Sequence, residues 1–294
     1  SETRLKTYIK KELRVILEEF GDKRRCQITS DVISAQAFSD QDMMPAENVT
    51  VVLSEKGWVK AAKGHEIDSS ALNYKSGDAF LKEAKGRSNK MAFFIDSSGR
   101  SYTLLANSLP SARGQGEPLT GRLTPPIGAE FIDVVMGDDE QLVILSSDAG
   151  YGFISTLGDL QSKTKSGKHA ITLSKEAKTM RLTKVQNLES DYLAVITNRA
   201  RLLIFQVSEL PHLSKGKGNK LINIKTDDFV AKEEFLIGLC IIKEHQKLRV
   251  EYGNGKKHKQ YSFSDLVNFT SHRARKGLTV PGVHGKALGI DAIG

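Results

Sequence analysis

The sequence predicts an all-β fold of about five repeated four-stranded units, preceded by one short helix. The first observation is a pattern of two short apolar strands around a tight turn, found five times, at residues 49–59, 91–104, 142–155, 193–205 and 248–263. Each turn contains Gly, Asn or Asp, which tolerate the positive φ that a tight hairpin requires. Four-stranded units that recur at a fixed period are typical of the blades of a radial, propeller-like ring.

The second observation is a common leucine that follows the later hairpins. Its positions are Leu109, Leu160, Leu210 and Leu266, which are 51, 50 and 56 residues apart. An additional apolar strand precedes several hairpins, which makes about four strands per unit. A solenoid of parallel strands is the main alternative, but hairpin turns make neighbouring strands antiparallel. The first unit looks incomplete, and we expect residues 286–293 to return and complete it.

The amino-terminal region has a different pattern. In residues 1–20, apolar side chains recur at spacings of three and four between Lys, Arg and Glu, which indicates an amphipathic helix that stops near Gly21. We therefore divide the chain into a helical segment at residues 1–25, a linker at 26–46 and a β domain at 47–294. One short helix cannot bury its apolar stripe alone, so it must pack against something else.

Composition indicates an anionic partner. Of 294 residues, 39% are hydrophobic and 27% charged, with a net charge of +8. Such a surface attracts polyanions, nucleic acid before acidic membrane. Two distant cysteines, the absence of a signal peptide and an apolar run too short to cross a bilayer favour the cytoplasm and no membrane partner. The missing initiator methionine fits a fragment or a processed chain.

Four loops share a Gly- and base-rich composition: residues 111–116, 162–168, 214–220 and 272–277, with a weaker relative at 60–65. None of the five contains Asp or Glu, although the chain has 35 acidic residues. Glycine allows close backbone approach to a phosphate, and Lys and Arg replace counterions along a duplex. One such loop alone would indicate little, but repetition favours DNA binding. The candidate DNA-binding residues are Lys60, Lys63, Arg113, Arg122, Lys163, Lys165, Lys168, Lys215, Lys217, Lys220, Arg273, Arg275 and Lys276.

Several strings resemble a known family. They are LSEKGWV at 53–59, LPSARGQGEPLTG at 109–121, SDAGYGF at 147–153 and LSKGKGNK at 213–220. They are similar to the C-terminal domain of the A subunit of bacterial DNA topoisomerase IV (the ParC type), which is related to the gyrase A C-terminal domain. The resemblance covers roughly residues 45–290, while residues 1–25 resemble the end of that subunit's catalytic portion.

The resemblance implies a β-pinwheel whose basic rim binds and bends duplex DNA, presents the transported segment and helps discriminate DNA topology. It implies a heterotetramer of two A and two B subunits, which uses ATP and Mg²⁺ on other domains. The gyrase signature loop is absent, and so is the catalytic tyrosine, since no tyrosine here follows an arginine. We expect no catalysis and no cofactor in this chain. A propeller-like protein-interaction module without DNA binding is the alternative.

Overall fold

The computed structural model describes residues 1–22, 46–255 and 257–294. An amino-terminal helix and a β domain form separate units. Helix α1 spans Glu2–Phe20 and ends as predicted, where the Gly21 N–H donates to the Leu17 carbonyl. The predicted linker lies outside the described residues except for Ala46. Among the described residues, no helix is both long and apolar enough to cross a membrane.

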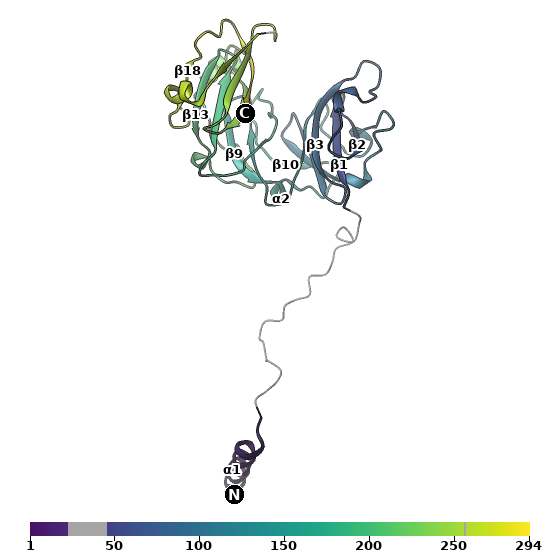
Figure 1. Cartoon of the computed structure of the whole chain (residues 1–294), viewed down its shortest axis with the longest axis vertical. Coiled ribbons are helices and arrows are strands. Elements are labelled where there is room, and N and C mark those ends of the chain that lie inside the picture. Colours follow the sequence, from purple (N-terminus) through teal and green to yellow (C-terminus); the bar gives the residue numbers. More distant parts are fainter. Residues whose placement is uncertain (23–45, 256) are drawn as a thin grey trace. The chain divides into compact units, whose positions relative to one another are not determined.

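Each of the five sheets contains one β-hairpin, as predicted, and strands of three of these hairpins (β1, β2, β9 and β13) are labelled in Figure 1. The hairpins are β1 (Asn48–Ser54) with β2 (Trp58–Lys63), β4 (Met91–Asp96) with β5 (Arg100–Leu105), β8 (Leu142–Ser146) with β9 (Tyr151–Thr156), β12 (Tyr192–Thr197) with β13 (Arg201–Gln206), and β16 (Lys247–Tyr252) with β17 (Lys257–Tyr261). Glycine supplies the positive φ in four turns. In the fourth hairpin that conformation falls on Ala200, at φ 55°, rather than on Asn198.

One edge strand of each sheet follows its hairpin in the chain. These strands are β3 (Phe80–Arg87), β7 (Phe131–Met136), β11 (Thr183–Lys184), β15 (Leu236–Ile242) and β19 (Ala287–Ile293). The sequence indicated an additional strand just before several hairpins. In the structure each such strand pairs with the earlier hairpin in the chain, not with the one that it precedes. The expectation that residues 286–293 complete the first unit is wrong, because β19 pairs with β16, with Ile290 opposite Val250.

The opposite edge of each of the first four sheets is supplied from the following repeat. The strands are β6 (Glu117–Pro118), β10 (Lys168–His169), β14 (Asn219–Lys220) and β18 (Leu278–Thr279). They pair with β2, β5, β9 and β13, respectively. From the second repeat on, the chain thus forms a hairpin, adds a short strand to the previous sheet and then adds an edge strand to the sheet of its own hairpin. Within the described residues the fifth sheet has three strands, in the order β17-β16-β19.

Apolar side chains between neighbouring sheets form the core. Strands β4, β8 and β12 are buried along nearly their whole length, which explains their continuous apolar sequences. The four recurring leucines are buried beside short helical turns. The turns are η2 (Ala106–Ser108), α2 (Leu157–Leu160), η4 (Val207–Glu209) and η5 (Phe263–Phe269); η1 (Ser69–Ala71), η3 (Leu119–Gly121) and α3 (Thr226–Val230) lie in other connections.

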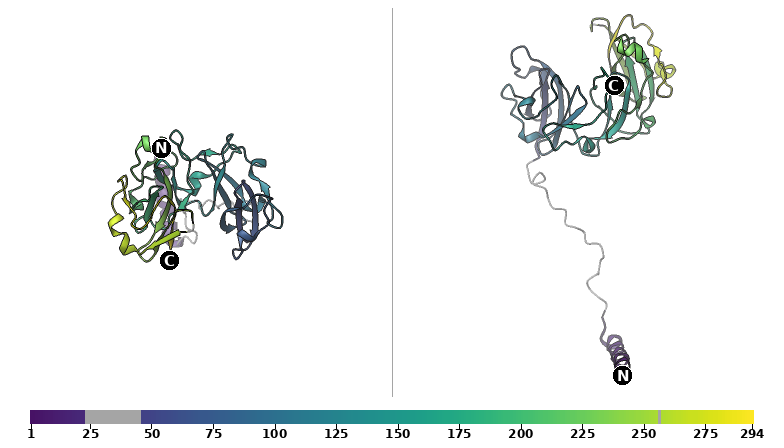
Figure 2. Two further views of the ribbon diagram at one scale, coloured as in Figure 1. Left: turned by 90° about the horizontal axis from the view of Figure 1, so that it is seen from above. Right: turned by 180° about the vertical axis from the view of Figure 1, so that it is seen from behind.

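A cavity of about 990 Å³ lies within the β domain. It is lined by β3, β7, β11, β15 and β19, the first edge strand of each sheet. Figure 2 shows the sheets from two further directions, with colours following the chain from blue to yellow. Because the first edges face this cavity, the supplied strands β6, β10, β14 and β18 lie at the edges away from it. The basic loops lead into those supplied strands.

Candidate nucleic-acid interface

Each basic loop is fixed at both ends to the edge of the preceding sheet. In the first loop, the Ala61 N–H donates to the Pro110 carbonyl at 2.8 Å and the Ala112 N–H donates to the Ala61 carbonyl at 2.9 Å. The chain then bulges outward and rejoins the same strand where Glu117 pairs with Val59. The third and fourth loops are held first by backbone contacts to Ile154 and Ile204, and the second by a hydrogen bond from the Ser162 N–H to the Thr103 hydroxyl. These three loops rejoin their sheets at Ser101 (second loop), Gly152 (third) and Leu202 (fourth).

A glycine closes each loop just before the second fixed point. These glycines are Gly116, Gly167, Gly218 and Gly277, with φ between 73° and 92°. A Cβ at Gly116 would lie 2.5 Å from the Val59 carbonyl oxygen, and one at Gly218 would lie 2.3 Å from that of Gly152. The sequence suggested that these glycines let a phosphate approach. Their geometry shows that they let the loop approach the edge strand.

Several of the predicted cations hold the loops in place. Carbonyls at the ends of the short helical turns lack intrahelical partners and favour a cation. Arg122 Nη1 donates to the Ser108 carbonyl at 2.7 Å, Lys168 Nζ donates to that of Asp159, and Arg273 Nε donates to that of Glu209 at 3.1 Å. Arg122 also forms an ion pair with Glu117 at 2.9 Å. Lys220 Nζ donates to the Asn223 side chain at 3.1 Å.

The remaining predicted cations in the four loops are exposed. They are Arg113, Lys163, Lys165, Lys215, Lys217, Arg275 and Lys276. Lys217 Nζ lies 4.1 Å from the Tyr151 ring centroid, a cation–π contact that leaves the ammonium at the surface. Lys63, at the end of β2, is also exposed and forms an ion pair with Glu47 at 2.9 Å. Every one of the four loops therefore presents at least one exposed cation.

Lys60 does not belong to this exposed set, which corrects the sequence-based assignment. Its side chain is 2% exposed, and its ammonium donates to the Asn73 carbonyl and lies 3.9 Å from the Tyr74 ring centroid. Burial lowers the pKa of Lys60, and the nearby Asp78 carboxylate opposes that shift. A phosphate outside the domain cannot reach this ammonium.

The sequence-based assignment did not include two cations that lie beside the loops. Arg199 follows β12, and Lys225 lies just beyond the third loop; both line one cavity together with Lys276 of the fourth loop. The signal in the sequence was weak. Arg199 stands in a hairpin turn where a solvated charge is ordinary, and Lys225 falls five residues after the loop.

Comparison with known proteins gives a consistent result. The family described as DNA gyrase C-terminal domain, β-propeller, matches residues 141–185 and 191–232. The A subunit of DNA topoisomerase 4 from Pseudomonas aeruginosa is 47% identical over 281 residues, which cover 96% of this chain. The solved ParC C-terminal domain of E. coli is 43% identical with a TM-score of 0.75, and the match covers 84% of this chain and 98% of that one.

A solved DNA gyrase A C-terminal domain has a TM-score of 0.61 at 16% identity, over 84% of this chain and 83% of that one. This likeness concerns the fold alone. The match to the Pseudomonas aeruginosa protein spans 37% of that protein's length. Since the bladed sheets, the order of the repeats and the sequence identity over nearly the whole chain agree, the chain belongs to the family of C-terminal domains of the DNA topoisomerase IV A subunit.

Proposed function

We propose that the β domain binds duplex DNA without sequence preference and bends it along the outer edges of its sheets. The observation that carries this proposal is that one arrangement recurs on four successive sheets. In each, a loop held at both ends against the sheet edge presents exposed Lys or Arg. Lysine and arginine neutralise phosphates and release counterions whatever the base sequence. Equivalent loops on successive sheets supply such contacts at intervals along one duplex.

Direct reading of base edges requires an element that enters a groove. Within the described part of the β domain, the α-helices are Leu157–Leu160 and Thr226–Val230, four and five residues long. Neither is long enough to lie along a major groove as a recognition helix does. Phosphate contact through the loops therefore accounts for the binding that we propose.

Bending follows from the placement of the loops. A duplex that touches loops on more than one sheet must follow the edges of those sheets. Smooth bending of 20–30 base pairs by 40–90° costs on the order of 1–6 kcal/mol, which additional phosphate contacts can offset.

Within the whole protein, we propose that this domain presents the transported DNA segment and helps discriminate DNA topology. Catalysis, ATP and Mg²⁺ would belong to the rest of the A subunit and to the B subunit, in a heterotetramer that acts on the bacterial nucleoid in the cytoplasm. The chain itself would have no catalytic activity.

Charge reversal in one loop tests the proposal. Lys163 and Lys165 are exposed and have no side-chain hydrogen bond or ion pair within the described residues. We expect Lys163→Glu/Lys165→Glu to weaken binding to a labelled duplex by roughly 10- to 100-fold at low salt, since two phosphate contacts become repulsive. Fluorescence anisotropy measures the affinity.

The control is Lys10→Glu/Lys11→Glu, which makes the same change in net charge on exposed positions of α1. This variant should bind within a few-fold of the wild type. Equal losses in both variants would show that net charge, rather than the loops, determines binding. A wild type that does not bind would instead favour a protein-interaction module.

A further inference from the structure

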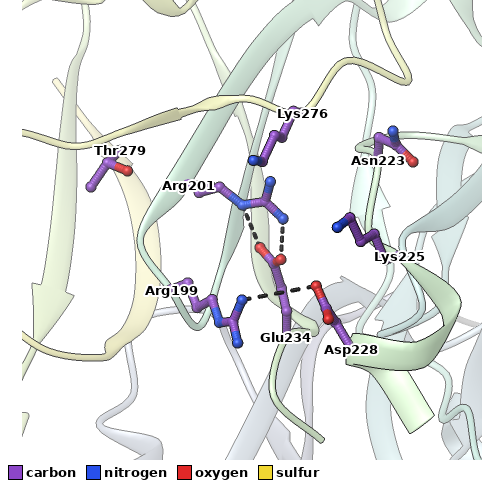
Figure 3. Close-up of a pocket in the computed structure, with 8 residues that line it drawn as sticks. All are labelled: Arg199, Arg201, Asn223, Lys225, Asp228, Glu234, Lys276 and Thr279. Carbon is purple, nitrogen blue, oxygen red and sulfur yellow. Dashed lines mark hydrogen bonds and ion pairs between the residues drawn. The ribbon is translucent and has the colours of Figure 1, made fainter. Parts of the chain in front are cut away.

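We infer that the cavity between the third and fourth basic loops is a binding site for a phosphate group. The cavity has a volume of about 390 Å³ and is lined by Arg199, Arg201, Asn223, Lys225, Asp228, Glu234, Lys276 and Thr279 (Figure 3). The inference rests on the proposed function for one of the two phosphate sources, the DNA backbone. Free phosphate is the other source.

Segments next to both loops form the walls of the cavity. The Ala274 N–H donates to the Leu221 carbonyl at 2.8 Å, and the Asn223 N–H donates to the Arg275 carbonyl at 2.9 Å. These two backbone hydrogen bonds hold the fourth loop against the segment that follows the third. Lys276 and Lys225 thereby come to line one space, although 51 residues separate them in the chain. A duplex that passes from one loop to the next crosses this point.

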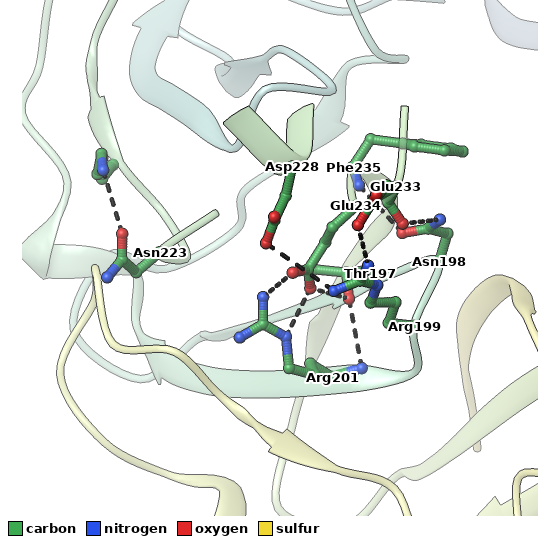
Figure 4. A network of polar contacts seen from close by, with 10 residues as sticks. Thr197, Asn198, Arg199, Arg201, Asn223, Asp228, Glu233, Glu234 and Phe235 are labelled. Atoms are coloured by element: carbon green, nitrogen blue, oxygen red, sulfur yellow. Dashed lines mark hydrogen bonds and ion pairs between the residues drawn. The ribbon is translucent and has the colours of Figure 1, made fainter. Parts of the chain in front are cut away.

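A buried ion pair forms the floor. Glu234 is 1% exposed and Arg201 is 9% exposed. Arg201 Nε donates to Glu234 Oε1 at 2.5 Å, Nη2 donates to Oε2, and the Thr197 hydroxyl donates to Oε1 at 2.9 Å (Figure 4). The other guanidinium nitrogen, Nη1, is buried and has no partner. A buried N–H group without an acceptor is rare in native structures, so this nitrogen retains a donor for an acceptor that enters the cavity.

Charge in the cavity is unbalanced. Glu234 pairs with Arg201, while Arg199 lies 3.9 Å from Asp228 and 2.7 Å from a third carboxylate, Glu233, at the rim. Four cations therefore stand against three carboxylates. Lys225 and Lys276 have no side-chain hydrogen bond or ion pair within the described ranges. In Figure 3, Arg201 and Lys276 point toward one another, and Lys225 points into the same space. The two lysines therefore give the cavity an excess of positive charge.

Phosphate fits this arrangement better than a carboxylate does. Free phosphate carries up to two negative charges and a backbone phosphodiester carries one, and both offer more than one acceptor oxygen to Arg201 and the two lysines. The charge of either group also offsets the excess of cations around the cavity. In the DNA-bound protein the group would be a phosphodiester of the backbone, and in its absence a free phosphate.

The test uses the full chain and a Lys225→Gln/Lys276→Gln variant, which replaces two ammonium groups at exposed positions by uncharged amides. One arm follows inorganic phosphate by ³¹P line broadening. The other measures affinity for the labelled duplex. The control for both arms is Lys10→Gln/Lys11→Gln on α1. We expect saturable phosphate binding by the wild type and the control, and a loss of at least about fivefold in the variant.

The two arms separate the sources. If the variant loses affinity for both phosphate and duplex, the site takes a backbone phosphodiester. If it loses only phosphate binding, the site takes a free phosphate. If phosphate does not saturate and the variant binds duplex like the wild type, the inference is overturned. A wild type that binds phosphate but no duplex would overturn the proposed function and leave the phosphate site standing.

Discussion

Replacement of Gly116 by alanine is expected to destabilise the β domain by roughly 3 kcal/mol. The left-handed conformation, at φ 92°, costs an L-residue about 1–2 kcal/mol. The added Cβ would also lie 2.5 Å from the Val59 carbonyl oxygen, and a backbone atom cannot move aside as a side chain does. For a domain of this size the melting temperature should fall by roughly 5–10 °C, which differential scanning calorimetry measures.

Gly114→Ala is the matched control, two residues away in the same loop. A Cβ at Gly114 would meet no atom within 4 Å, and its φ lies outside the left-handed region. This variant should have a melting temperature equal to or slightly above that of the wild type, because alanine restricts the unfolded chain. Equal melting temperatures in the two variants would contradict the role that we assign to the closing glycines.

Glu234→Gln is expected to have the largest effect on stability, about 3–5 kcal/mol. Removal of one partner of a buried ion pair leaves an uncompensated charge, here the Arg201 guanidinium, in the interior. The substitution also weakens the acceptor for the Thr197 hydroxyl. Chemical denaturation followed by circular dichroism measures the free energy of unfolding.

The neighbouring residue provides the comparison. Glu233 pairs with Arg199 at 2.7 Å, but its side chain is 57% exposed, and exposed pairs contribute about 0–1 kcal/mol. Glu233→Gln should therefore unfold at nearly the wild-type denaturant concentration. If Glu234→Gln were equally mild, the Arg201–Glu234 pair would not hold the fourth hairpin to β15.

The repeated hairpins could be predicted because the residues that determine each hairpin lie close together in the sequence. Alternating or continuous apolar runs end at turns that favour Gly, Asn or Asp, and both signals lie within about 15 residues. The recurring leucines were equally visible, since burial beneath each short helical turn requires a large apolar side chain at Leu109 and its three counterparts.

The exchange of strands between sheets could not be predicted. Strand β6 is only Glu117–Pro118, is exposed, and carries no apolar pattern of its own. Its pairing with β2 is decided by where the first basic loop is fixed. Strand β19 is a short, mostly apolar sequence that would suit the edge of the first sheet or the fifth, and only tertiary packing selects β16.

The candidate interface was predicted in part. The loops can be recognised from their composition, but composition does not show which cations are exposed and which are buried or already paired. Lys60 lies within the buried strand Trp58–Lys63 and is covered by Asn73 and Tyr74. The Arg201–Glu234 pair joins residues 33 positions apart, and the sequence contains no sign that one nitrogen of Arg201 lacks a partner.

The salt dependence of duplex binding tests the central claim most directly. The wild-type chain would be titrated against a labelled duplex of about 40 base pairs at several salt concentrations. If each of the four loops neutralises at least one phosphate, the logarithm of affinity should fall against the logarithm of salt concentration with a slope of about −3.6 or steeper. A slope near zero, or no binding at about 50 mM salt, would contradict DNA binding through the loops.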